Sequence, residues 1–186
     1  FNNNQIHGFG RMEIPSTGVY EGLWKDNQQN GFGILKYCNG DVYKGCFKDG
    51  LPHGHGSLKH GSFIASAASI YIGDWVLGCK SGYGVMDDIV SGEKYLGTWL
   101  DNKKHGNGLI VTSDGIYYEG TFNQDIFTGH GLMILEDGTH YEGEFKGTGN
   151  INGKGVLTLN SGHMIEGSLM GSPSDGIKIS NGTLNL

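Results

Sequence analysis

The residues that come nearest to a metal site are three histidines in one short stretch, His53, His55 and His60. Closely spaced imidazoles are common zinc ligands. His53, however, stands directly before a Gly-x-Gly sequence, and the same position elsewhere in the chain is taken by other small or polar residues. The position of His55 varies freely. We therefore interpret these histidines as ordinary repeat residues and predict no metal site.

Carboxylates are the second class of candidates, because Glu21, Glu119, Glu142 and Glu166 occupy one position of a repeated motif. In a sheet of hairpins, that position recurs two strands apart, roughly 9.6 Å, near the upper limit for an inverting glycosidase pair. A periodic row is better explained as a solvated acidic face. No Gly-x-Ser-x-Gly motif is present, and no Gly-x-Gly precedes a helix that could hold phosphate. We predict no catalytic residue, no cofactor and no enzyme activity.

Charge and cysteine content narrow the class of partner. The net charge is −6 and there is no run of Lys or Arg, so we expect no nucleic-acid binding. The chain has three cysteines, an odd number, and no C-x-x-C motif: Cys38, Cys46 and Cys79. This argues against a disulfide framework and is typical of proteins in the reducing cytosol, so we predict a cytoplasmic protein. The chain opens on Phe1 inside a repeat, and we interpret it as a fragment of a larger multi-domain protein.

A repeat with a period of 23 or 24 residues dominates the sequence. Its first half is Tyr-x-Gly-x-Trp/Phe, clear in six repeats that begin at Tyr20, Tyr43, Tyr71, Tyr95, Tyr118 and Tyr141, with a worn seventh at Ile165. Its second half is Gly-x-Gly, and we assign a structural role to Gly31, Gly33, Gly54, Gly56, Gly82, Gly84, Gly106, Gly108, Gly129, Gly131, Gly153 and Gly155.

The spacing within each half is that of a strand, because residues at i, i+2 and i+4 share one face. Polar turn sequences such as Lys25-Asp26-Asn27 and Asn39-Gly40 separate the halves. The pattern predicts an all-β fold, an elongated single-layer antiparallel meander of hairpins with roughly fifteen short strands. We expect the aromatic rings to lie over glycines.

The domain prediction is one repeat domain over residues 1–186 with about seven hairpins. One step between repeats is longer than the rest, 28 residues from Gly54 to Gly82. We assign the additional residues to an enlarged loop between strands over 57–70, either a tolerated insertion or a projection that touches a partner.

These motifs resemble MORN repeats, whose pattern runs Tyr-Glu-Gly-x-Trp/Phe, then Gly-x-Gly-x-Leu, then Asp-Gly. The segment Tyr141-Glu142-Gly143-Glu144-Phe145 is a near-perfect instance, and the resemblance covers essentially the whole chain. It implies a twisted single-layer antiparallel sheet with a groove.

Several stretches are further similar to the MORN region of a multi-domain guanine-nucleotide exchange factor, over residues 82–89, 92–99, 117–120, 153–158 and 176–179. That similarity implies a scaffold that recruits partners, with the exchange activity in a separate domain. It implies a Rab-family small GTPase, or the exchange domain of the same protein, as the partner, and a location on early endosomes through the whole protein.

An aromatic row on one face is the candidate binding surface, because a single layer leaves part of that face open. On the opposite face the repeated glutamate becomes Lys44, Ile72 and Leu96 in the central repeats, which gives an apolar centre. Two alternatives remain. In one, the aromatic rings serve only as the packing surface of the sheet. In the other, the replacement of glutamate in the central repeats is sequence drift without functional consequence. The predicted partner-binding residues are Tyr71, Ile72, Trp75, Tyr83, Tyr95, Leu96, Trp99, Tyr118 and Phe122.

Two rival functions remain open at this point. Binding to anionic membrane lipid needs clustered Lys or Arg, and the 13 basic residues face 19 acidic ones without a run. A spacer or dimerisation element is the other rival, since open strands at either end of a sheet can pair with a second molecule.

Overall fold

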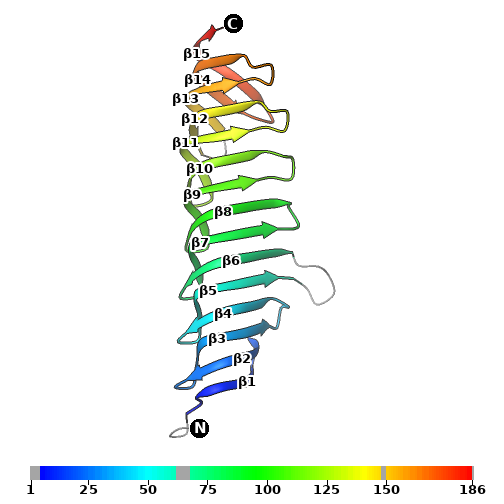
Figure 1. Ribbon diagram of the computed structural model, residues 1–186, viewed down its shortest axis with the longest axis vertical. Helices are drawn as coiled ribbons and strands as arrows, with labels where there is room; N and C mark the ends of the chain where they lie inside the picture. Colours follow the sequence, from blue (N-terminus) through cyan, green and yellow to red (C-terminus); the bar gives the residue numbers. More distant parts are fainter. Residues whose placement is uncertain (1–4, 62–67, 148–149, 186) are drawn as a thin grey trace. The chain divides into compact units, whose positions relative to one another are not determined.

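The computed structural model describes residues 5–61, 68–147 and 150–185. Every strand in it runs antiparallel to its neighbours, and the strand order in the sheet is the order in the sequence (Figure 1). Over these residues there is no helix. The predicted fold class, an all-β antiparallel meander of hairpins, is confirmed. None of the described segments is a helix long and apolar enough to cross a membrane.

The residues fall into two compact units, which we describe separately. Unit 1 comprises Phe1–Gly92 and Trp99–Asn102, and unit 2 comprises Glu93–Thr98 and Lys103–Leu186. The strands of unit 1 are β1 (Gly8–Ile14), β2 (Gly18–Lys25), β3 (Gln28–Tyr37), β4 (Val42–Lys48), β5 (Leu51–His60), β6 (Ser69–Val76) and β7 (Cys79–Asp88). Strand β8 (Glu93–Leu100) contributes residues to both units, and those of unit 2 continue as β9 (Lys103–Val111), β10 (Tyr117–Asn123), β11 (Ile126–Ile134), β12 (His140–Lys146), β13 (Asn150–Thr158), β14 (Met164–Ser172) and β15 (Gly176–Asn185).

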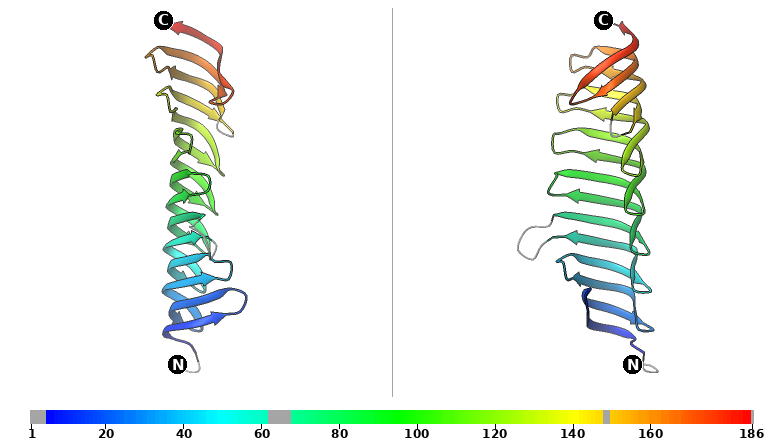
Figure 2. Two further views of the ribbon diagram at one scale, coloured as in Figure 1. Left: turned by 90° about the vertical axis from the view of Figure 1, so that its right-hand side faces the viewer. Right: turned by 180° about the vertical axis from the view of Figure 1, so that it is seen from behind.

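Within each unit two kinds of connection alternate along the chain, tight turns at one end of the paired strands and longer connections at the other end (Figure 2). In five two-residue turns both residues have positive φ, as a type I′ hairpin turn requires. These pairs are Asp26–Asn27, Asp49–Gly50, Leu77–Gly78, Asp101–Asn102 and Gln124–Asp125. The polar turn sequences are therefore turns as predicted, and Leu77 is the one aliphatic residue among these five pairs.

The loop predicted over 57–70 is shorter in the structure. Strand β5 extends to His60 and β6 begins at Ser69, and residues 62–67 of the connection lie outside the described residues. The amide of Ala68 donates to the carbonyl of His60 at 2.7 Å, so the strand pairing continues to the base of the loop. The extra residues therefore belong to the connection itself.

The core of each unit is a layer of aromatic rings on one face of the sheet. The first and fifth residues of the six clear Tyr-x-Gly-x-Trp/Phe motifs, which are the aromatic ones, are exposed by 6% or less. In the third clear motif the hydroxyl of Tyr71 donates to the carbonyl of Asp74 at 3.0 Å, and the Trp75 indole donates to that of Gly56 at 3.2 Å. Each polar atom of these rings thus has a partner, which permits their burial.

The two glycines of a Gly-x-Gly motif serve different purposes, as Gly54 and Gly56 show. A Cβ at Gly56 would overlap the ring of Tyr43, which lies directly over it. A Cβ at Gly54 would meet only the Cβ of Cys46, at 3.5 Å, but Gly54 has φ of 76°, in the left-handed region. The prediction that rings lie over glycines is confirmed for the second glycine. The first glycine is needed for its backbone conformation, a reason that the spacing did not reveal.

Rings of successive repeats touch edge to face. Tyr43 contacts Phe47 of its own repeat, with centroids 5.0 Å apart, and Trp75 of the next repeat at 5.2 Å. Burial raises the pKa of Tyr20 and of Tyr118 to about 12, and it raises the pKa of Tyr43 and Tyr71 as well. The phenols therefore stay protonated and neutral at physiological pH.

Candidate interaction surfaces

Side chains that alternate with the core residues point to the opposite side of the strands, which we call the outer face of each unit. The residue between Tyr and Gly of the motif is the reference position on this face. Its occupants are Glu21, Lys44, Ile72, Leu96, Glu119, Glu142 and, in the worn repeat, Glu166. Leu96 is partly buried and the other six are exposed. The outer face therefore differs between repeats while the core does not.

An apolar cluster lies on the outer face of unit 1 across β6 and β7. Ile72 pairs with Val85 on the neighbouring strand, and Tyr83 lies one position along the same face. The exposed fractions are 50% for Ile72, 41% for Val85 and 54% for Tyr83. These three residues, which we call the central apolar cluster, offer adjacent apolar surface to solvent.

A polar network borders this cluster. The carboxylate of Asp74 accepts from the Tyr83 amide at 3.1 Å and lies 3.2 Å from Nδ1 of His55. Asp74 thereby fixes the backbone at Tyr83 and joins β5, β6 and β7 on the outer face. An apolar patch with a hydrogen-bonded polar edge is the usual composition of a protein-binding surface.

The three histidines considered as metal ligands do not converge. Nδ1 of His53 accepts from the Leu77 amide at 3.4 Å, His55 lies beside Asp74, and His60 Nδ1 lies 2.9 Å from the Asp41 carboxylate. Each histidine has a separate structural partner. Across the described residues, no group of three or more His, Cys, Asp or Glu side chains could hold a metal ion.

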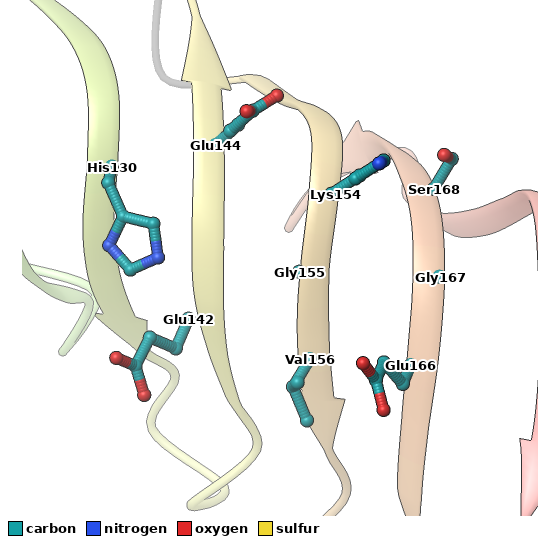
Figure 3. Close-up of a pocket in the computed structure, with 9 residues that line it drawn as sticks. All are labelled: His130, Glu142, Glu144, Lys154, Gly155, Val156, Glu166, Gly167 and Ser168. Carbon is teal, nitrogen blue, oxygen red and sulfur yellow. The ribbon is translucent and has the colours of Figure 1, made fainter.

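A shallow hollow of about 740 Å³ lies on the outer face of unit 2 (Figure 3). Its floor includes Gly155, Gly167 and Val156, and its polar lining is His130, Glu142, Glu144, Lys154, Glu166 and Ser168. The β-ladder places Val156 between Glu142 and Glu166, and it places His130 beside Glu144. Three carboxylates against one lysine make the hollow acidic, so it favours cationic groups.

Lysines gather on the outer face of unit 1 across β3, β4 and β5. Lys36 and Lys59 both pair with Val42, and Lys44 lies between Ile34 and Ser57. All three lysines are exposed, and within the described part of the chain none is within 4.0 Å of a carboxylate. The sequence analysis found no basic run, because the strand register, not the chain order, brings these three together.

Six of the nine residues predicted to contact a partner lie in the core: Tyr71, Trp75, Tyr95, Trp99, Tyr118 and Phe122. The expectation that a single layer leaves these rings open is wrong, because each ring is covered by its neighbours and by glycine backbone. Ile72 and Tyr83 are exposed and Leu96 is partly exposed, so their contact with a partner stays a prediction. Val85 was missed, although its place next to Gly84 puts it on the outer face by strand alternation.

The repeat geometry agrees with the comparison against known protein families. The MORN repeat model matches residues 1–19, 20–42, 43–62, 71–88, 95–117, 118–140 and 141–164. The chain belongs to the MORN-repeat family. The seven matched MORN segments include the six clear motifs and the Gly-x-Gly sequences between them, so the features that define the family here are those that build the core.

Alsin is a curated relative that this MORN chain resembles in sequence. The identity to alsin of Homo sapiens is 44% over 184 residues, and the same values hold for Mus musculus. The alignment covers 96% of this chain and 11% of alsin, so the chain spans about a tenth of that relative's length. The alsin homolog of Drosophila melanogaster is 48% identical over 46 residues, which are 25% of this chain and 3% of the homolog.

Among solved structures, the TCP domain of SAS-4 of Drosophila melanogaster, in complex with a proline-rich motif of Ana2, has a TM-score of 0.39. The sequence identity is 12%, and the match covers 93% of this chain and 90% of that one.

Proposed function

We propose that this MORN chain is a non-catalytic docking module of an alsin-like guanine-nucleotide exchange factor. Its partner is a Rab-family small GTPase or, alternatively, another segment of the same protein such as the exchange domain. The similarity to alsin supports the kind of parent protein, and with it a place on endosomes. The central apolar cluster is the observation on which the docking proposal depends.

The central apolar cluster supports protein docking because Ile72 is apolar at a position that is charged in five of the seven repeats, Leu96 being the other exception. Ile72 stands where four other repeats have glutamate and one has lysine, and Val85 opposite it is also apolar. Exposed aliphatic side chains form no hydrogen bonds with water, and the free energy of the system falls when a partner removes their apolar surface from water. Tyr83 adds an aromatic side chain, a residue type enriched at binding hot spots.

The experiment is a pull-down of a panel of Rab GTPases, each loaded with GDP or with a non-hydrolysable GTP analogue. We expect one member to be captured in one nucleotide state. The double variant Ile72→Asp/Val85→Asp should weaken that capture at least about ten-fold, because two charges would be placed in a desolvated contact. Both side chains point away from the core, so the thermal midpoint should stay close to that of the unmodified chain.

Met170→Asp is the matched control, since Met170 is an exposed apolar residue on the outer face of unit 2. It should leave capture unchanged. Equal capture by the double variant and the unmodified chain would contradict a role for the cluster. A panel with no captured member would exclude the GTPase and leave the isolated exchange domain as the partner to be tested in the same format.

Leu96 belongs to unit 2 and is tested by a separate Leu96→Asp variant. If Leu96 contacts the same partner, this variant lowers capture as the double variant does. If it has no effect on capture, the contact is confined to the cluster on β6 and β7.

A further inference from the structure

Two outer-face patches of opposite charge remain outside the proposed GTPase contact. The lysine patch consists of Lys36, Lys44 and Lys59 on β3 to β5 of unit 1, and the glutamate patch consists of Glu142, Glu144 and Glu166 on β12 and β14 of unit 2. Neither includes a residue of the central apolar cluster. Their chemistry can therefore be considered on its own.

The lysine patch is positively charged across β3, β4 and β5, and Glu21 of the neighbouring β2, which pairs with Ile34, lies at its border. Among the outward residues of β3, β4 and β5 there is no Asp or Glu, and Lys48 at the end of β4 adds a fourth ammonium group. Asp41, in the turn before β4, is held by His60 at 2.9 Å and by the Gly61 amide. The lysines of the patch have no ion-pair partner in the part of the chain that the structure describes.

The glutamate patch is its counterpart in charge. Glu142, Glu144 and Glu166 are exposed, and within the described residues no Lys, Arg or His nitrogen lies within 4.0 Å of their carboxylates. Lys154 and His130 share the hollow with them, and Lys146 ends β12, so the patch remains acidic but is partly offset (Figure 3). An incoming ammonium group would find carboxylates that are not already paired.

Each charged patch also has apolar residues beside its charged residue at the equivalent position of the repeat. Lys44 and Glu142 occupy the same position of the repeat, between Tyr and Gly. Lys44 lies beside Ile34, and Glu142 lies between Leu132 and Val156. Because both patches are built on strands with the same spacing, roughly 4.8 Å between neighbours, side chains on one can meet side chains on the other in register.

We propose that the lysine patch of one molecule docks on the glutamate patch of a second molecule of this chain. Lysine ammonium groups then meet the three carboxylates, and Ile34 and Val42 approach Leu132 and Val156. Complementary charge sets the orientation of such a contact, and the apolar residues exclude water from it. The contact is heterologous, because it joins two different surfaces of identical molecules. Each molecule carries both surfaces, one lysine patch and one glutamate patch.

The test uses two variants that each lack one patch, Lys36→Gln/Lys44→Gln/Lys59→Gln and Glu142→Gln/Glu144→Gln/Glu166→Gln. Sedimentation velocity at about 50 mM salt should show association of the unmodified chain that increases with concentration. Association should weaken at least about ten-fold at about 500 mM salt, because exposed charges are screened. Each variant alone should remain monomeric.

An equimolar mixture of the two variants is the decisive sample. One retains the lysine patch and the other the glutamate patch, so the mixture should form a one-to-one complex that cannot extend further. A variant with the same change in formal charge away from both patches, Asp101→Asn/Asp114→Asn/Glu136→Gln, should associate as the unmodified chain does. Circular dichroism and thermal melting should be alike for all four proteins, since every substituted side chain is exposed.

Three results would overturn the proposal. The unmodified chain could stay monomeric at low salt up to the highest concentration reached. The mixture could fail to form the one-to-one complex although the unmodified chain associates, which would place the contact elsewhere. Finally, the chain could remain monomeric yet bind phosphatidylserine vesicles through Lys36, Lys44 and Lys59, which would assign the lysine patch to a membrane surface.

Discussion

Tyr71 and Ile72 are neighbours in the chain, but they belong to two faces of the sheet that follow different constraints. On the core face, the residues at the Tyr71 position are tyrosine in six repeats, each under 2% exposed. On the outer face, the position of Ile72 is occupied by glutamate, lysine, isoleucine or leucine. The core face is restricted by ring packing over glycine, whereas the outer face needs only side chains compatible with a strand. The contrast indicates where to look for specificity: in the residues that break the repeat.

The largest expected effect is alkaline unfolding, which acts on the core face. Burial raises the pKa of Tyr20 and Tyr118 to about 12, from a usual value of 10.0. Above the usual pKa, the unfolded chain releases phenol protons that the folded chain retains, so the free energy of unfolding falls as the pH rises. We expect the folded state to be fully stable below pH 10 and lost progressively above it.

Tyrosinate absorbance and tryptophan fluorescence, followed together during an alkaline titration, check this prediction. The core tyrosines should ionise in the same step in which the fluorescence reports unfolding. Ionisation of the core tyrosines well before any loss of structure would contradict their burial.

The next largest effect separates the two glycines of one motif. Gly56→Ala should destabilise by about 1–3 kcal/mol, because the added methyl overlaps the Tyr43 ring and overpacking is costly. Gly54→Ala should destabilise by about 1–2 kcal/mol through backbone conformation alone. Asparagine tolerates the left-handed region, so Gly54→Asn should be milder than Gly54→Ala, whereas Gly56→Asn should be worse than Gly56→Ala. Urea denaturation of the four variants would test this, and the same order at both positions would disprove the division of roles.

The smallest effect concerns Leu77, which occupies a left-handed turn position with φ of 47° and is 58% exposed. The equivalent residues are Asp26, Asp49, Asp101 and Gln124. Leu77→Asn should stabilise unit 1 by about 0.5–1 kcal/mol, because asparagine adopts this conformation at less cost. Thermal melting provides the measurement, with Leu51→Asn, an exposed strand residue, as the control that should not stabilise. A lower melting temperature for Leu77→Asn would contradict this prediction and would mean that the leucine side chain makes a stabilising contact.

The fold could be predicted from the sequence because alternation and turn chemistry act locally. Residues such as Tyr118, Gly120 and Phe122 recur at strand spacing, and Asp101–Asn102 has the composition of a hairpin turn. Their side of the sheet follows from parity alone. The bounds of the loop could not be found in the same way, since Ser57 to His60 continue β5 without any motif that marks a strand.

The candidate surfaces were harder to predict, for two physical reasons. First, the burial of Trp75 and Trp99 depends on rings supplied by neighbouring repeats. An isolated motif therefore suggests that these two rings are exposed, whereas the assembled sheet buries them. Second, Lys36, Lys44 and Lys59 stand on three successive strands and come together only through the register of β3 to β5. A search along the sequence for basic runs cannot detect a patch that runs across strands.

The regular spacing of the outer face within each unit has a consequence for affinity. One reference position appears every two strands, roughly 9.6 Å, on a backbone that the buried rings hold in place. A ligand whose own groups recur at that pitch could engage several repeats together. Each contact could then be weak, because the second would form at the high effective concentration set by the first. Avidity of this kind would let the chain discriminate ligands by their periodicity as well as by their chemistry.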